Sequence, residues 1–186
     1  MSTRSVSEFE KIIGYTFNHK KFLKIALTHK SYIDENPTFE SNQRYEFLGD
    51  TILDFDLTNY LFNKYPDLEE GSLTKIRSSA VNQEALVDIG NKISIGNYLY
   101  LSRAEDSTGG RKKASIIEDA VEALIAALYF DGGLEIVNRF VSNFIYPNIK
   151  ELSVDPGSKD YKTRLQEYYA KKGKKVFNKC KACHAM

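Results

Sequence analysis

The sequence contains few of the features that cross-link a small secreted fold or anchor a chain in a membrane. Its 186 residues include two cysteines, four prolines and no tryptophan. Cys180 and Cys183 both lie in the last seven residues, which excludes a disulfide framework for the rest of the chain. No run of about 18 apolar residues is present, so we expect no membrane-spanning helix. The first residues contain no apolar signal core, and we therefore expect a soluble, cytoplasmic protein.

The net charge is also small. Lys and Arg total 26 against 25 Asp and Glu, a formal charge of +1, which does not by itself indicate a nucleic-acid-binding protein. This balance conceals an asymmetry, because residues 159–181 carry nine Lys or Arg and two acidic residues. The hydrophobic content of 42% is ample for a core. The length fits one domain of ordinary size with an appendage.

The most informative stretch is residues 42–65, where apolar residues recur at three- and four-residue steps. This spacing is typical of an amphipathic helix. Glu46 and Asp50 are four residues apart and would lie one turn apart on one face. Gly49 lies beside them and has no side chain, which would let another backbone or a ligand come close. For an isolated pair of this kind, a solvated acidic stripe is the commoner explanation.

A second stretch, residues 114–130, favours a functional interpretation. It is apolar nearly all round, which is typical of a buried helix. Asp119 and Glu122 are three residues apart on one face, and no Lys or Arg within the stretch can pair with them. Burial of an unpaired carboxylate is costly, so we expect their partner to come from elsewhere in the fold or to be a metal ion. Glu118 lies about 100° around the helix from Asp119, and we expect it to be solvated.

Two helices that each carry two carboxylates on one face predict an acidic site where they converge. Four negative charges cannot coexist there unless some are protonated or a divalent cation neutralises them. Ligands that are all oxygen atoms favour Mg²⁺ or Mn²⁺. Such a site suits hydrolysis of a phosphodiester bond, because the metal polarises the phosphate and generates hydroxide.

Five motifs occur in an order and spacing that match one known family. The central motif is Tyr-Glu-Phe-Leu-Gly-Asp-Thr at 45–51, and the others lie at 26–32, 65–77, 109–111 and 118–133. Together they resemble the catalytic domain of bacterial ribonuclease III. The resemblance covers residues 5–150.

The resemblance implies a homodimeric, Mg²⁺-dependent endoribonuclease, in which Mn²⁺ can replace Mg²⁺. It would cut both strands of double-stranded RNA in RNA processing, including ribosomal RNA precursors and structured transcripts, and leave 5′-phosphate and 3′-hydroxyl ends. It further implies that Glu46, Asp119 and Glu122 hold the metal, and that Asp50 and Glu122 form the catalytic pair. Phe47 matches a position that inserts into a socket of the partner subunit, and a place in the core of its own chain is the alternative.

Periodicity and capping residues predict an all-α domain, because no stretch alternates convincingly as a strand. Ser7, Ser72 and Asn82 are the expected N-caps of three helices, and Asn42 or Ser41 that of the central helix. Pro66 is expected to end the central helix. Besides 42–65 and 114–130, the expected helices cover 6–13, 19–27, 72–80, 134–146 and a segment from Asn82 to about Ile93.

Several predictions concern the connections between these helices. Residues 34–41 are rich in turn-forming residues and are expected to form a loop. Residues 107–113 are expected to form a flexible basic loop that steers a phosphate backbone or is an ordinary connection. His29 is expected to be a hydrogen-bonded structural residue rather than a catalyst. Lys75 and Arg77 are candidates for contact with RNA, with a solvated face as the equal alternative.

Some positions on the central helix depart from the family pattern. Gln43 stands where the family usually carries Glu, a position associated with engagement of RNA rather than with the metal. Asp54 and Asp56 are additional acids. Asp54 falls four residues after Asp50, and we expect it to be solvated.

The C-terminal part departs further from the pattern. After a linker at 151–158, residues 159–169 resemble the first helix of a double-stranded RNA-binding domain, so we interpret 159–186 as the truncated start of such a domain. Cys180-Lys-Ala-Cys183-His184 fits the C-x-x-C-H pattern of haem attachment and resembles the opening of a small c-type cytochrome. We expect no haem, because no export signal is present, and favour a truncation, a frameshift or a junction of unrelated sequences.

The sequence is compatible with three functions. The first is the metal-dependent nuclease. The second is a non-catalytic dimeric binder of structured RNA, which has no need for four carboxylates in one site. The third is a redox protein that uses the C-x-x-C-H segment.

Overall fold

The computed structural model describes residues 5–147 and 149. Within these residues the regular structure is helical and contains no strand beyond a single bridge between Thr28 and Tyr100, which confirms the all-α prediction. None of the described helices is long and apolar enough to cross a bilayer. The predictions for 151–186 lie outside the described residues. The helices are α1 (Val6–Ile13), α2 (Lys20–Ala26), α3 (Lys30–Glu35), α4 (Gln43–Lys64), α5 (Glu70–Ala80), α6 (Gln83–Lys92), α7 (Arg103–Ser107) and α8 (Ala114–Phe144), with 3₁₀ turns η1 (Ile95–Tyr98) and η2 (Gly110–Lys112).

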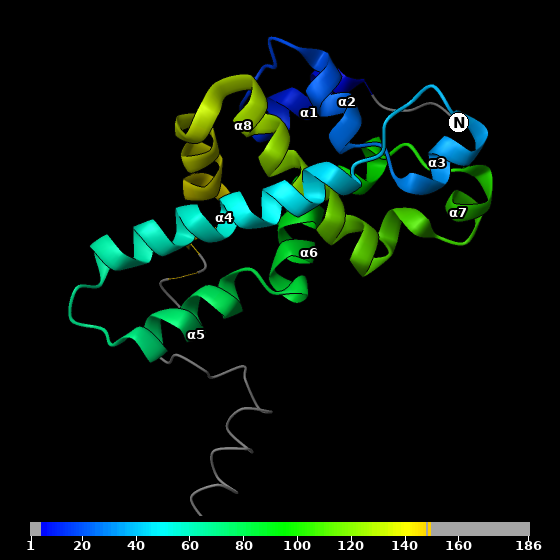
Figure 1. Ribbon diagram of the computed structural model, residues 1–186. Helices are drawn as coiled ribbons and strands as arrows, with labels where there is room; N and C mark the ends of the chain where they lie inside the picture. Colours follow the sequence, from blue (N-terminus) through cyan, green and yellow to red (C-terminus); the bar gives the residue numbers. More distant parts are fainter. Residues whose placement is uncertain (1–4, 148, 150–186) are drawn as a thin grey trace, which may run out of the picture.

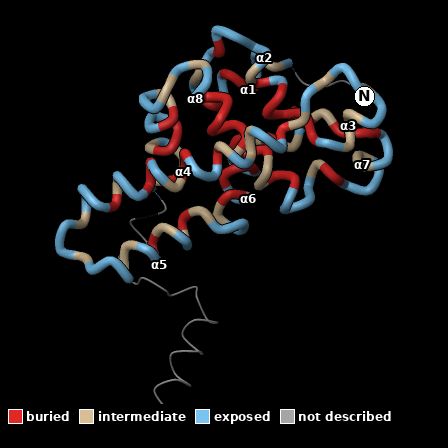
Figure 2. Tube along the Cα trace, in the orientation of Figure 1, coloured by how far each residue is buried: buried red, intermediate tan, exposed pale blue. Residues whose placement is uncertain are grey.

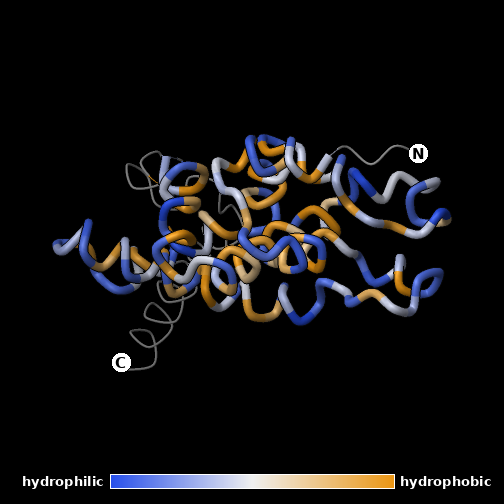
Figure 3. The backbone as a smooth tube through the Cα atoms, turned by 90° about the horizontal axis from the view of Figure 1, so that it is seen from above, coloured by the Kyte–Doolittle hydropathy of each residue, from blue (hydrophilic) through white to orange (hydrophobic). Residues whose placement is uncertain are grey.

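The helices α4 and α8 form the centre of the fold. The first half of α8 is apolar on nearly all sides, so it packs against α4, α6 and α2 at once. Buried and hydrophobic residues gather where these helices meet (Figures 2 and 3). The C-terminal half of α4 and the whole of α5 extend from this core as a pair (Figure 1).

The helix labelled α8 consists of two arms separated by a break at Gly133. There φ is 74° and ψ is −173°, a conformation that glycine adopts without steric penalty. The predicted stop at this point and the further helix over 134–146 are therefore confirmed. Beyond the break the chain returns to α4, where Asn138 and the Tyr146 hydroxyl donate hydrogen bonds of 3.2 and 2.8 Å to the buried carboxylate of Asp56.

Asp131, just before the break, ties the N-terminal helices to α8. Its carboxylate accepts hydrogen bonds from the Tyr15 hydroxyl (2.8 Å) and from the backbone N–H groups of Asn18 (2.8 Å) and His19 (2.9 Å). Burial acts to raise the pKa of Asp131, but these hydrogen bonds outweigh it and hold the pKa below its usual range. Burial and the bond to Asp131 raise the pKa of Tyr15 to about 12.

The predicted helix bounds agree well with the structure, whereas two predicted caps are wrong. Asn82 caps α6 as expected, through a hydrogen bond that its side chain accepts from the Ala85 backbone. At α1 the cap is Ser5 rather than Ser7, and the Ser5 hydroxyl accepts from the Ser7 backbone. The helix α5 begins two residues before Ser72.

The segment after His29 forms a helix that the sequence did not predict. The last two residues of α3 belong to the loop expected at 34–41. Nδ1 of His29 accepts a hydrogen bond from the Ser31 backbone (3.2 Å) and so caps α3, in keeping with its expected structural role. The short helix contains no buried residue. A distant residue supports it, because the Ser102 backbone donates to the Ser31 hydroxyl (3.1 Å).

Candidate active site

The two predicted carboxylate pairs come together where α4 crosses α8. Gly49 is buried at this crossing, and a Cβ built on it would lie 1.8 Å from the backbone oxygen of Glu122. Only glycine permits this approach, so the expectation that Gly49 admits another backbone is confirmed. Glu46 and Asp50 flank Gly49 on α4, and Asp119 lies one turn before Glu122 on α8. The close crossing therefore brings the two pairs near enough for the charges of Glu46, Asp50 and Asp119 to act on Glu122.

The carboxylates at this point destabilise one another's charged forms. Burial raises the pKa of Glu122, and the negative charges around it raise the pKa further, to about 8. Burial also raises the pKa values of Glu46 and Asp119. The charges that act on Glu122, in decreasing order of effect, belong to Asp50, Glu118, Glu46 and Asp119.

A cation from outside the two helices acts on the site. Lys30, at the start of α3, opposes the rise in the pKa values of both Glu46 and Asp119. Both pKa values nevertheless stay above their ordinary range, because burial and neighbouring acids outweigh this single charge. Lys30 thus supplies part of the positive charge that the sequence required from elsewhere in the fold. The site as a whole is negative.

The donor set of the site suits a hard divalent cation. The side chains of Glu46, Asp50, Asp119 and Glu122 offer oxygen atoms only, the ligands that Mg²⁺ and Mn²⁺ prefer. A cation among them would reverse the repulsion that raises their pKa values. As the side chains stand, no three of the described His, Cys, Asp or Glu residues form a closed ligand cluster. Asp50 is exposed and the other three are half-buried, which leaves these side chains room to turn toward an ion.

Glu118, which was expected in solvent, is only partly exposed. It is half-buried, and Nε2 of Gln83 on α6 donates a hydrogen bond to its carboxylate. Its charge contributes to the raised pKa values of Glu46, Asp119 and Glu122. Sequence reasoning missed the contact because Gln83 lies 35 residues away. The available signal was the four-residue step from Glu118 to Glu122, which places both on one face.

The basic segment 107–113 is more ordered than predicted. Arg111 donates two hydrogen bonds to the Asp106 carboxylate (2.8 and 3.1 Å). It also donates to the carbonyl oxygens of Gly96 and Leu99, at 3.0 Å each. The guanidinium is therefore committed to the fold, and the prediction of a flexible phosphate-steering loop is wrong at Arg111.

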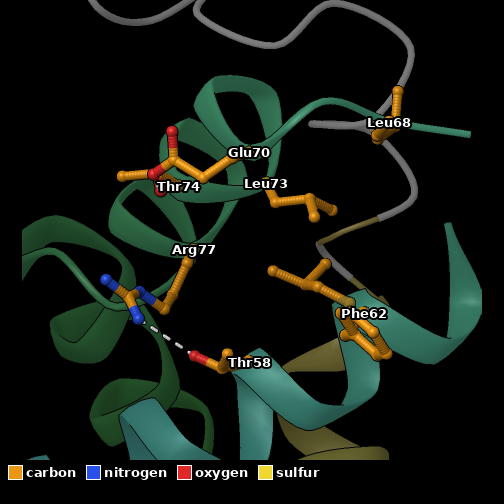
Figure 4. Close-up of a pocket in the computed structure, with 8 residues that line it drawn as sticks. Thr58, Phe62, Leu68, Glu70, Leu73, Thr74 and Arg77 are labelled. Atoms are coloured by element: carbon orange, nitrogen blue, oxygen red, sulfur yellow. Dashed lines mark hydrogen bonds between the residues drawn. The ribbon is translucent and has the colours of Figure 1, made fainter. Parts of the chain in front are cut away.

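A second cation considered for RNA contact is also bound within the fold. Arg77 of α5 donates to the Thr58 hydroxyl of α4 (3.0 Å; Figure 4), and its Nε lies 3.9 Å from the Asp54 carboxylate. The Asp54 side chain is nevertheless 41% exposed, in keeping with its expected solvation. Arg77 and Thr58 border a pocket of about 510 Å³ between the two helices, whose other lining residues are Leu61, Phe62, Leu68, Glu70, Leu73 and Thr74.

A row of phenylalanines on α4 faces away from the core. Phe47 is 79% exposed, Phe55 59% and Phe62 71%. Steps of eight and seven residues place the three on one side of the helix. A role for Phe47 in the core of its own chain is excluded by this exposure. An exposed apolar row of this kind indicates an interaction surface.

Comparison with known proteins is consistent with this geometry. Residues 19–149 match the family model described as ribonuclease-III-like. The chain is 42% identical over 165 residues to ribonuclease 3 of a Nitratiruptor species, covering 89% of this chain and 71% of that protein. It is 42% identical over 173 residues to ribonuclease 3 of Clostridium perfringens, covering 93% of this chain and 73% of that protein. The nuclease domain of ribonuclease III from Campylobacter jejuni, in a structure concerned with flexibility in the region of dimer formation, superposes with a TM-score of 0.72 at 36% identity, covering 77% of this chain and 98% of that one.

Proposed function

The chain belongs to the ribonuclease III family of endoribonucleases, and on that premise we propose that it hydrolyses phosphodiester bonds of double-stranded RNA where α4 crosses α8. The products carry 5′-phosphate and 3′-hydroxyl ends. The contact between Gly49 and the Glu122 carbonyl carries this proposal, because it brings together the helix segments that each carry two of the carboxylates. The proposed substrates are ribosomal RNA precursors and structured transcripts of the cytoplasm.

We assign a Mg²⁺ site to the crossing, with Mn²⁺ as a substitute. Glu46, Asp119 and Glu122 are the proposed ligands, and Asp50 is paired with Glu122 in catalysis. When bound, the ion would polarise the phosphate and make a hydroxide nucleophile available at neutral pH. Asp50 is the exposed member of the four, which suits a group that meets the incoming RNA.

We further propose a symmetric homodimer formed through the outward face of α4. The exposed side chain of Phe47 supports this proposal, since a large aromatic residue seldom stays in water without a partner. Dimer formation in the related nuclease domain from Campylobacter jejuni adds to this support. Two copies of the site in one dimer suit cleavage of the two strands of a duplex.

The proposed catalytic domain spans residues 5–150. Residues 151–158 are the proposed linker, and 159–186 the proposed start of a double-stranded RNA-binding domain. The described residues and the span matched by the family model, 19–149, both fall within the first of these.

Cleavage of a long RNA duplex tests the proposal. The purified chain is incubated with the duplex at low salt, either with Mg²⁺ or with a chelator, and the product lengths are measured. Short duplex fragments are expected only with Mg²⁺. Glu122→Gln is expected to lower the cleavage rate at least about a hundredfold while RNA binding persists. Glu84→Gln, at an exposed acid of α6, serves as the control.

Two results contradict the proposal. Cleavage by Glu122→Gln at the wild-type rate places the chemistry elsewhere in the protein. Binding of the duplex without any cleavage by the wild-type chain favours a non-catalytic binder of structured RNA.

A further inference from the structure

Glu118 is adjacent in α8 to the proposed metal ligand Asp119, yet the proposed reaction assigns it no role. It directly precedes Asp119 in α8 and lies one turn before Glu122, about 40° around the helix from it. Its side chain is half-buried rather than extended into solvent. Glu118 therefore lies on the face of α8 that carries Glu122.

Gln83, an exposed residue of α6, contacts this carboxylate. It is the first residue of α6, and its Nε2 donates a hydrogen bond to Glu118. The end of α6 is itself fixed, because the Asn82 side chain caps the helix. Further along, α6 packs so closely on α8 that a Cβ on Gly90 would lie 2.3 Å from the Ile117 side chain. Gln83 thus reaches Glu118 from a rigid neighbouring helix.

The negative charge of Glu118 affects the pKa of each proposed metal ligand. After burial, it has the largest effect on the pKa of Asp119, and it also raises the pKa values of Glu122 and Glu46. Lys30 opposes the effect at Asp119 and Glu46 only. A carboxylate fixed next to other carboxylates is destabilising unless positive charge is added to the site.

We propose that Glu118 is a fifth carboxylate of the site, oriented by Gln83, and that it increases the affinity of the site for a divalent cation. The inference rests on the proposed metal-dependent function. The attraction of one negative charge for a divalent ion several ångströms away, in a partly solvated site, corresponds to about a five- to tenfold gain in affinity. Gln83 acts through Glu118 and is a positioning residue.

Binding of Mn²⁺ to the full chain without RNA tests the inference. The electron paramagnetic resonance signal of free Mn²⁺ gives the dissociation constant directly and does not depend on activity. Glu118→Gln is expected to raise the dissociation constant about five- to tenfold. Glu118→Asp, which keeps the charge, is expected to restore it to within about twofold of wild type. Glu84→Gln removes an exposed acid from α6 and is expected to change nothing.

The role of Gln83 is tested in the same titration. Gln83→Leu is expected to raise the dissociation constant about two- to threefold, because Glu118 keeps its charge but loses its orientation. In the Glu118→Gln background the same substitution is expected to have no further effect. An equal effect in both backgrounds overturns the positioning role.

The remaining outcomes separate this inference from the proposed function. Wild-type affinity in Glu118→Gln overturns the inference, while a large loss of affinity in Glu122→Gln still supports the metal site. A lower thermal unfolding midpoint in Glu118→Gln with unchanged Mn²⁺ affinity assigns Glu118 to the packing of α6 on α8 and also overturns it. A wild-type chain that binds no Mn²⁺ overturns both proposals.

Discussion

Gly49 of α4 lies against the backbone carbonyl of Glu122 on α8, closer than any side chain at that position would allow. A Cβ there would lie 1.8 Å from the Glu122 oxygen and 3.3 Å from the Ala126 nitrogen. The same contact brings Glu46 and Asp50 to the carboxylates of α8. Stability and activity therefore depend together on the absence of one side chain.

Gly49→Ala is expected to destabilise the fold by about 3 kcal/mol or more, because both neighbouring atoms belong to backbone and the helices must separate. Chemical denaturation measures the loss, and cleavage activity is expected to fall with it. Gly71→Ala in α5 is the control, since a Cβ there meets nothing within 4 Å and alanine favours a helix by about 1 kcal/mol. A Gly49→Ala protein as stable as wild type contradicts the close crossing.

Phe47→Ala is expected to weaken the proposed dimer without unfolding the subunit. The side chain is largely in water in the single chain, so the free energy of unfolding of the subunit should change by less than about 0.5 kcal/mol. An aromatic anchor in an interface contributes about 2 kcal/mol, which raises the dimer dissociation constant about 30-fold. Sedimentation velocity over a concentration series measures this constant. Ile12→Ala, at an exposed residue of α1, is the control, and an unchanged dimer argues against the α4 interface.

Arg111→Ala is expected to lower the free energy of unfolding by about 2 kcal/mol. It removes two charged hydrogen bonds to Asp106 and leaves the carbonyl groups of Gly96 and Leu99 without this donor. Lys112→Ala, at the exposed neighbouring position, is expected to leave stability unchanged. Urea denaturation and RNA binding at several salt concentrations distinguish a structural role of Arg111 from a role in RNA binding. Loss of RNA affinity in Arg111→Ala without loss of stability restores the phosphate-steering role.

The stabilisation contributed by Asp131 is expected to disappear in acid. Its folded pKa lies below the ordinary value of 3.8, so its contribution is complete above that pH and is lost as the pH falls through the folded pKa. Asp131→Asn is expected to be about 2 kcal/mol less stable than wild type at neutral pH. The difference should narrow and then close as the pH falls below 3.8 and through the folded pKa, which denaturation at a series of pH values measures.

The exposed Asp88 of α6 provides the matched substitution for this series. Asp88→Asn is expected to follow the wild-type stability at every pH. A difference between Asp131→Asn and wild type that stays constant into acid contradicts the assignment.

Local signals predicted most of the helical framework. The bounds of α1, the cap of α6 at Asn82 and the stop before Gly133 all depend on residues adjacent in the chain. Their energetics are local, so the sequence contains the relevant information. The convergence of Glu46 with Glu122 was predicted from two helical faces and a glycine.

Contacts between distant residues account for what the sequence did not predict. The helix α3 has no buried residue and is supported by the backbone of Ser102. Glu118 was expected in solvent because nothing near it in the chain indicates Gln83. Arg111 looked like part of a mobile cationic loop until the carbonyl groups that it bonds were placed beside it. Such partners are set by packing and not by periodicity.

The break at Gly133 has a mechanical consequence for α4. The two arms of α8 contact α4 at different points along its length. The first arm packs on Gly49, and the second arm, together with Tyr146, bonds Asp56. These points are two turns, or about 10 Å, apart along the axis. A helix that contacts its neighbour at one point can slide or rotate against it, whereas contacts at two points along its length oppose both movements. The register of Glu46 and Asp50 against the other helix is therefore locked in both translation and rotation, in a site where their like charges would drive them apart.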